Sequence, residues 1–139
     1  MVDVRIYWMS DDKPIVGVLM STYNGEKYIR EQLDSIFEQE DVNVKLFVRD
    51  DGSADRTRNI LKEYAVTYEL MDLSDGERVG PGESFMRLLC KAKEKIELQY
   101  FAFADQDDIW LKNKLSVAIK VIEQCEDKDA VLHSSNQFL

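Results

Sequence analysis

The stretch IVGVLM at residues 15–20 decides the fold of this 139-residue chain. Its apolar residues and one glycine follow one another without a polar break. This is typical of a strand covered on both faces, because a half-exposed strand alternates apolar with polar residues. The polar turn STYNG follows at residues 21–25. Apolar residues then recur at the spacing of one helix face, which predicts a helix over residues 26–39: Ile29, Leu33, Ile36 and Phe37.

The same order of strand, turn and helix recurs along the rest of the chain. Further strands are expected at residues 44–48, 66–70 and 100–104, with a fifth beginning at 131–132. Apolar helix faces separate them: Thr57, Ile60, Leu61 and Tyr64; Phe85, Leu88, Leu89, Ala92 and Ile96; Leu111, Leu115, Ala118, Ile119 and Ile122. Asn24 and Ser53 are candidate N-caps of the first two helices. The alternation predicts an α/β, Rossmann-like domain, whose mostly parallel sheet carries helices on both faces and has its first and fourth strands adjacent.

Length and composition limit the class of protein. We expect a single domain over residues 1–139, with residues 1–13 as a leader or an extra strand. A formal net charge of −9 argues against a nucleic-acid-binding surface, which needs positive charge to neutralise phosphates. The longest apolar run is too short to span a bilayer and the N-terminus lacks signal-peptide features. We therefore expect a cytoplasmic protein without a transmembrane segment.

Polar loops follow the first, second and fourth expected strands. Ligands of open α/β sheets bind at the carboxyl ends of the strands, so these loops are candidates for a site. They carry Thr22-Tyr23-Asn24, Asp50-Asp51-Gly52-Ser53 and Asp105-Gln106-Asp107-Asp108. The sequence lacks the glycine-rich motifs that bind dinucleotides or wrap phosphates. His133 is its only histidine, so a hydrolase triad is not expected.

Asp105 and Asp107 are candidate metal ligands. They lie two residues apart at the end of an extended segment, which projects both carboxylates to one side, whereas Asp108 points elsewhere. Two such carboxylates can hold Mn²⁺ or Mg²⁺ and leave coordination positions for water and diphosphate oxygens. The alternative is a solvated turn beside a helix N-terminus, where aspartate is also favoured. The apolar strand before these residues and the two other polar loops favour the metal site.

The first two loops suggest a nucleoside pocket. A carboxylate of Asp50 or Asp51 can accept the ring N–H of a uracil or thymine base, and Tyr23 offers an aromatic face for stacking. Each feature also has a structural explanation, because Asp, Gly and Ser suit a strand-to-helix turn and Tyr23 can be a packing residue. The turn Gly80-Pro81-Gly82 fits a helix entry as well as a ligand contact.

Together these motifs resemble the family-2 glycosyltransferases of the GT-A fold. The resemblance covers nearly everything from Pro14 onward and has its motifs in the family's order: STYNG at residues 21–25, VRDDGSAD at 48–55, GPGESF at 80–85 and FADQDDIW at 103–110. The last motif, followed by Lys114-Leu115, is the most specific. It is similar to the branch that includes rhamnosyltransferases and other enzymes of cell-surface polysaccharides.

The resemblance implies a nucleotide-sugar site and a divalent metal, Mn²⁺ or Mg²⁺, that stabilises the leaving diphosphate. Its donor-binding residues would be Thr22, Tyr23, Asn24, Asp50, Asp51, Gly80 and Asp105, with Asp105 and Asp107 at the metal. The enzyme would transfer sugar from a UDP- or dTDP-sugar, with inversion, to a glycan or lipid-linked acceptor. Such transfer uses a carboxylate base, which in this family lies beyond the metal motif. We therefore assign no catalytic residue within the chain.

The resemblance also sets expectations for the whole protein. We expect this chain to be the N-terminal donor-binding part, with the acceptor part absent, and to be unable to glycosylate an acceptor alone. An uncovered sheet edge near Val131 and Leu132 would favour a homodimer. The full-length enzyme could lie at the inner face of the cell membrane as a peripheral protein.

Two departures from the family pattern concern the donor contacts. Arg78 stands two residues before the loop glycine Gly80, and Ser84 stands before Phe85, where many relatives have Asn in both places.

Two rival classes fit the sequence less well. A sugar-1-phosphate nucleotidyltransferase would need a Gly/Arg/Lys-rich first loop, which is missing here. A phospho-accepting receiver module would carry its acidic pair after the first strand, whereas the acidic pairs here follow the second and fourth.

Overall fold

The computed structural model describes residues 13–95, 98–125 and 133 and shows an α/β domain. Four strands form one sheet in the order β3-β2-β1-β4, and every neighbouring pair in it is parallel. Helices alternate with the strands along the chain: β1 (Ile15–Thr22), α1 (Ile29–Phe37), β2 (Asn43–Asp50), α2 (Thr57–Thr67), β3 (Leu70–Asp72), α3 (Pro81–Lys95), β4 (Tyr100–Ala104) and α4 (Lys114–Glu123). The predicted fold class is therefore confirmed.

Strand β1 lies inside the sheet and explains the uninterrupted apolar run of the sequence. It pairs with β2 on one side and with β4 on the other, so Leu19 lies opposite both Phe47 and Phe103. The predicted adjacency of the first and fourth strands is confirmed. Because the three strands are parallel, their carboxyl ends lie at one edge of the sheet, which brings the three polar loops together.

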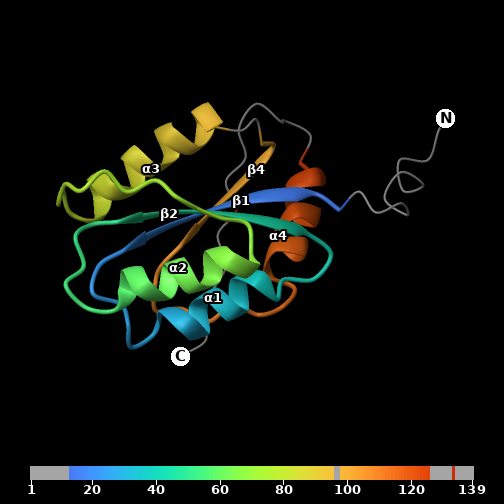
Figure 1. Cartoon of the computed structure of the whole chain (residues 1–139). Helices are drawn as coiled ribbons and strands as arrows, with labels where there is room; N and C mark the ends of the chain where they lie inside the picture. Colours follow the sequence, from blue (N-terminus) through green and yellow to red (C-terminus); the bar gives the residue numbers. More distant parts are fainter. Residues whose placement is uncertain (1–12, 96–97, 126–132, 134–139) are drawn as a thin grey trace.

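Helices cover both faces of the sheet. Helix α3 lies on one face, and α1 and α2 lie on the other (Figure 1). Successive side chains of β1 alternate between two apolar clusters, because side chains of a strand point to opposite faces. Val18 and Met20 join the larger cluster with α1, α2 and α4. Leu19 joins a smaller cluster beneath α3, together with Leu88.

The third strand was placed too early by the sequence. Val66 belongs to the last turn of α2 and is 88% exposed, and β3 spans only Leu70–Asp72. The alternation of Val66, Tyr68 and Leu70 imitates a strand, but Tyr68 follows the helix and stacks on Phe37 with ring centroids 4.2 Å apart. The expected strand at 131–132 lies outside the described residues.

The two expected N-caps were also wrong. Asn24 has a positive φ of 46° and lies before α1, whose N-cap is Tyr28. Its side-chain oxygen instead accepts the N–H of Ala54. The N-cap of α2 is Arg56, and the Ser53 hydroxyl accepts the N–H of Asn24. Both polar side chains therefore join the first two loops to each other.

The contribution of the smaller apolar cluster to stability can be tested by mutation. Leu88→Ala removes a fully buried side chain beneath α3 and should lower the free energy of unfolding by about 2–5 kcal/mol. Met86→Ala is the matched control, because Met86 lies on the same helix and is 59% exposed; its effect should stay within about 0.5 kcal/mol. Urea titration followed by circular dichroism measures both, and equal losses would contradict the assignment of this cluster.

Candidate functional site

A cavity of about 290 Å³ opens at the carboxyl ends of β1, β2 and β4. Six of the residues singled out in the sequence line it: Thr22, Tyr23, Asp51, Gly80, Asp105 and Asp107. Asn24 and Asp50 are not among the lining residues. Five further residues complete the wall: Ser21, Arg78, Pro81, Phe85 and Gln106. The three polar loops therefore meet the start of α3 at one cavity.

Gln106 joins the loop after β1 to the loop after β4. Its side-chain oxygen accepts the N–H of Tyr23 and its side-chain nitrogen donates to the Tyr23 carbonyl, each at 2.9 Å. The Gln106 side chain lies so close to Gly25 that a Cβ there would clash with its Oε1 atom. This two-bond contact fixes the spacing between the Tyr23 loop and the residues that flank Gln106, which are Asp105 and Asp107.

Three buried polar side chains hold the loop after β4. Gln32 and Ser35 belong to α1, and Gln39 lies just beyond its end at Phe37. They bind the backbone of the loop at three points: Gln32 Nε2 donates to the Asp105 carbonyl at 2.7 Å, the Trp110 N–H donates to Ser35 Oγ at 3.0 Å, and Gln39 Nε2 donates to the Leu111 carbonyl at 2.6 Å. The backbone that carries Asp105 and Asp107 is therefore held in place.

Asp50 organises the loop after β2 rather than the cavity wall. Its buried carboxylate accepts hydrogen bonds from the Thr22 hydroxyl at 2.9 Å, from the Ser53 N–H at 2.9 Å and from Arg58 Nε at 2.9 Å. Burial alone would raise the pKa of Asp50, but hydrogen bonds from Ser53, Arg58 and Thr22 outweigh it and hold the pKa below its ordinary value.

Asp51 faces the cavity and is oriented by the buried side chain of Arg49. The Nη1 atom of Arg49 donates to Asp51 Oδ1 at 2.9 Å, and the N–H groups of Val79 and Gly80 donate to the two carboxylate oxygens at 2.8 and 2.9 Å. Burial opposes the charged form, but these donors prevail and the pKa of Asp51 lies below its ordinary value. Asp51 is therefore an ionised hydrogen-bond acceptor at neutral pH.

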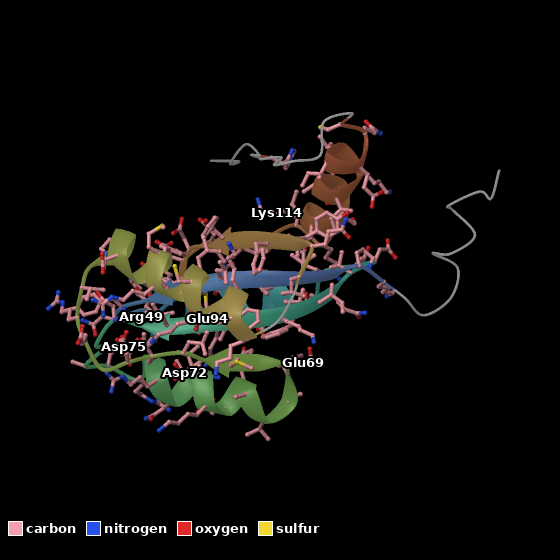
Figure 2. All side chains as sticks on the ribbon, turned by 90° about the horizontal axis from the view of Figure 1, so that it is seen from above. Arg49, Glu69, Asp72, Asp75, Glu94 and Lys114 are labelled. Atoms are coloured by element: carbon pink, nitrogen blue, oxygen red, sulfur yellow. The ribbon has the colours of Figure 1, made fainter. Side chains whose placement is uncertain are left out.

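Arg49 also binds Asp75, and Figure 2 shows the two residues together beside α3. Its Nη2 atom donates to Asp75 Oδ1 at 2.6 Å and to the Glu77 carbonyl at 2.7 Å, while Nη1 donates to the Ser84 hydroxyl at 2.9 Å. One guanidinium thus connects β2, the loop before α3 and the first turn of α3.

Asp105 and Asp107 line the cavity without a hydrogen-bond donor among the described residues. Burial, followed by the negative charges of Asp108 and Asp107, raises the pKa of Asp105. Within the described residues no group of three or more His, Cys, Asp or Glu side chains converges as a complete metal site. Two carboxylates that lack a positive partner still suit a hard divalent cation, which takes further ligands from water or diphosphate.

Arg78 supplies the positive charge of the cavity. It is the only cationic side chain among the lining residues, and its guanidinium carbon lies 4.2 Å from the centre of the Tyr23 ring. The sequence analysis placed Arg78, Phe85 and Gln106 in or beside the candidate motifs but assigned none of them a role in binding. A turn position, an apolar helix position and a residue between two aspartates look the same in proteins without a cavity.

The structure is thus an α/β domain with a cavity at the strand ends that three aspartates line. Residues 17–135 match the family described as "Glycosyl transferase family 2", and the chain belongs to that family. The resemblance seen in the sequence, including its GT-A fold, is confirmed.

Two curated relatives are named as glycosyltransferases of stated kinds. The chain is 44% identical over 103 residues to the dTDP-rhamnosyl transferase RfbG of Shigella flexneri, covering 72% of this chain and 35% of that protein. It is 35% identical over 107 residues to the putative teichuronic acid biosynthesis glycosyltransferase TuaG of Bacillus subtilis, covering 77% and 41% of the two proteins. The chain thus spans about a third of the length of the first relative.

Solved structures share the fold. TarS of S. aureus in complex with UDP-GlcNAc superimposes with a TM-score of 0.68 at 30% identity, covering 78% of this chain and 31% of that one. The mannosyltransferase PcManGT of Pyrobaculum calidifontis, in complex with GDP-Man and Mn²⁺, gives a TM-score of 0.67 at 25% identity, covering 83% of this chain and 36% of that one.

None of the helices in the described residues is both long and apolar enough to cross a membrane.

Gly25→Ala tests the contact between the two loops. The added methyl group would displace the Gln106 amide and break its two hydrogen bonds to Tyr23, which should lower the free energy of unfolding by about 1–3 kcal/mol. Gly82→Ala is the control, because a Cβ there meets no atom within 4 Å and alanine favours the helix. In a Gln106→Ala background, Gly25→Ala should cost little more. Urea denaturation measures the free energy of unfolding of Gly25→Ala, Gly82→Ala, Gln106→Ala and the double variant. The contact would be contradicted if Gly25→Ala were as stable as the unmodified chain.

The stability of the chain should fall in acid because of Asp50. A carboxyl whose pKa is lower in the folded state stabilises the fold above its unfolded pKa, near 3.8. That stabilisation is lost as the pH drops from there through the folded-state pKa. Asp50→Asn should be less stable at pH 7 and should lose less between pH 5 and pH 3 than the unmodified chain. Urea midpoints measured between pH 5 and pH 3 test this. If both proteins lost the same stability over this range, Asp50 would not be a source of the acid sensitivity.

Proposed function

We propose that this chain binds the donor of an inverting glycosyltransferase, and that the donor is a UDP- or dTDP-sugar. The observation that carries the proposal is the cavity at the strand ends. Asp51, Tyr23, Asp105 and Asp107 all line it. A nucleoside diphosphate needs an aromatic face and an N–H acceptor for its base and a divalent cation for its phosphates. This cavity offers the side chains for each.

The nucleoside end of the proposed site comprises Asp51 and Tyr23. The carboxylate of Asp51 accepts the ring N–H of the base, since its Oδ2 atom takes only the Gly80 N–H among the described residues and can accept a second donor. The Asp50 carboxylate does not line the cavity, and it accepts hydrogen bonds from the Thr22 hydroxyl and from the N–H and hydroxyl of Ser53. Of the two acidic residues, Asp51 is therefore the one that we assign to the base.

The diphosphate end comprises Asp105 and Asp107, which would hold Mn²⁺ or Mg²⁺. When bound, the cation supplies Lewis-acid stabilisation of the negative charge on the leaving nucleoside diphosphate. The two side chains contribute negative charge to hold it, and their backbone is fixed by Gln106 and Gln32. The neighbouring mannosyltransferase structure contains Mn²⁺ with GDP-Man, which supports a metal in this fold.

The acceptor side of the reaction is proposed from the relatives. Names such as dTDP-rhamnosyl transferase and teichuronic acid biosynthesis glycosyltransferase support a glycan or lipid-linked acceptor and a role in cell-surface polysaccharides. We assign the carboxylate base for inversion to no residue of this chain. The cytoplasmic location, the peripheral association with the membrane and the homodimer stay predictions.

Metal-coupled binding tests the proposal. Mn²⁺ should raise the affinity of the chain for UDP and dTDP, and Asp107→Asn should lower that affinity about tenfold or more because one metal ligand is lost. Its stability should change little, since Asp107 is exposed and accepts no hydrogen bond within the described residues. Asp41→Asn is the matched control, because Asp41 is exposed and does not line the cavity. Calorimetry in Mn²⁺ and in a chelator measures the affinity for UDP and dTDP. Equal affinities in the two conditions would refute metal coupling.

A further inference from the structure

We propose that Gln32 of α1 is a positioning residue for the cation of the proposed donor site. Its side chain does not line the cavity and would touch neither the cation nor the donor. It acts through the backbone of Asp105, whose carbonyl it binds from the helix layer. The inference rests on the proposed function and extends it to a residue outside the cavity. Gln32 belongs to none of the motifs that the sequence singled out.

The side chain of Gln32 is 0% exposed and lies on the buried face of α1. Its helix neighbours Ile29, Leu33 and Ile36 are equally buried and belong to the larger apolar cluster. A primary amide is costly to bury unless its nitrogen and its oxygen both have hydrogen-bond partners, whereas an apolar side chain fills such a place without that cost. The feature that distinguishes an amide from an apolar side chain at this position is therefore the set of hydrogen bonds that it makes.

The Gln32 amide connects the two ends of the segment that carries the proposed metal ligands. Its Nε2 atom donates to the Asp105 carbonyl at 2.7 Å. Its Oε1 atom accepts the Ser35 hydroxyl at 3.0 Å, and the same hydroxyl oxygen accepts the Trp110 N–H at 3.0 Å. Asp105 and Trp110 lie at the two ends of the segment that contains Asp107. One turn of α1 therefore holds both ends of this segment.

The bond to the Asp105 carbonyl affects the direction of the carboxylate of the same residue. This carbonyl belongs to the peptide group between Asp105 and Gln106, so the bond from Gln32 fixes the plane of that peptide. The Gln106 side chain holds the next residue through two bonds to Tyr23. Groups that bind a ligand must be held within about 0.5 Å of their productive positions. A small shift of this peptide is therefore enough to weaken a cation site.

Repulsion between neighbouring carboxylates makes this support necessary. The carboxylates of Asp105 and Asp107 line one cavity and have no hydrogen-bond donors within the described residues. Like charges in one cavity repel each other and favour a loop that moves them apart. The bond from Gln32 holds neutral backbone, so it resists that movement without neutralising either charge. Both carboxylates therefore stay available to a cation.

Calorimetry with UDP and Mn²⁺ on the 139-residue chain tests the assignment. The quantity to compare is the ratio of the UDP Kd in a chelator to the UDP Kd in Mn²⁺, which isolates the contribution of the cation. Gln32→Met keeps the length of the side chain but has no donor. Its ratio should fall about tenfold, the size of effect expected when a residue that orients a metal ligand is lost. The Kd in the chelator should change little, because Gln32 does not line the cavity.

Hydrogen exchange without metal gives a second readout, which does not depend on UDP. Gln32→Met should raise the exchange of the amides over residues 105–110, because one anchor of this segment is lost. Mass spectrometry of the peptides that cover these residues measures the change.

Gln39→Met is the control that is matched for stability. Gln39 is 7% exposed and also binds loop backbone, through the Leu111 carbonyl at 2.6 Å and the Leu115 N–H at 2.9 Å, but both groups lie beyond residues 105–110. The two variants should lower the urea midpoint by similar amounts, whereas the ratio should fall further in Gln32→Met. Gln124→Met changes an exposed glutamine and should leave the midpoint and the ratio as they are.

Equal falls of the ratio in Gln32→Met and Gln39→Met would overturn the assignment and show a general loosening of the loop. Faster exchange with an unchanged ratio would overturn it as well, while the proposed function stands. If Gln32→Met does not fold, Ser35→Ala is used instead, because it removes the hydroxyl that binds Gln32 Oε1; an unchanged ratio in that variant overturns the assignment. Equal UDP affinities of the unmodified chain in Mn²⁺ and in the chelator would contradict the proposed function, and this inference with it.

Discussion

The buried guanidinium of Arg49 is the interaction on which the rest of the site depends. An arginine with 0% exposure is unfavourable in a core unless every donor is paired, because removing its charge from water is costly. Asp51, Asp75, the Ser84 hydroxyl and the Glu77 carbonyl provide the partners. No buried side-chain nitrogen or oxygen in the described residues lacks a partner. The loop between β3 and α3 must therefore close over the end of β2.

This closure gives the cavity its shape more than it gives the fold its stability. A buried ion pair contributes little net stability compared with apolar packing, whereas its geometry excludes alternative arrangements. Arg49 and Val79 donate to the Oδ1 atom of Asp51 and Gly80 donates to its Oδ2 atom, so the carboxylate is held in one orientation. The same bonds fix the loop that carries Arg78. The contacts of the buried Arg49 therefore determine where Asp51 and the Arg78 loop lie in the wall of the cavity.

The sequence predicted the sheet and the edge at which the cavity opens because both follow from short-range patterns. The apolar run at residues 15–20 predicted a central strand, and the polar residues after three strands predicted the edge of the sheet where the cavity lies. The partners of Arg49 and Gln106 could not be predicted in the same way. Asp75 is 26 residues from Arg49 and Tyr23 is 83 residues from Gln106, so only the tertiary fold brings them together. The third strand was misplaced because Val66 and Tyr68 alternate as a strand does while α2 continues to Thr67.

The carboxylates at the two ends of the cavity differ in their hydrogen-bond donors. At the proposed nucleoside end, the Asp51 carboxylate is held in one orientation by three hydrogen-bond donors. At the proposed diphosphate end, hydrogen bonds from Gln32 and Gln106 hold the loops, while the carboxylates of Asp105 and Asp107 have no donors within the described residues. Mutual repulsion of these carboxylates would be relieved by a cation. Hydrogen bonds therefore hold the backbone of the proposed metal motif in place, whereas the negative charge of its side chains would be neutralised by a bound cation.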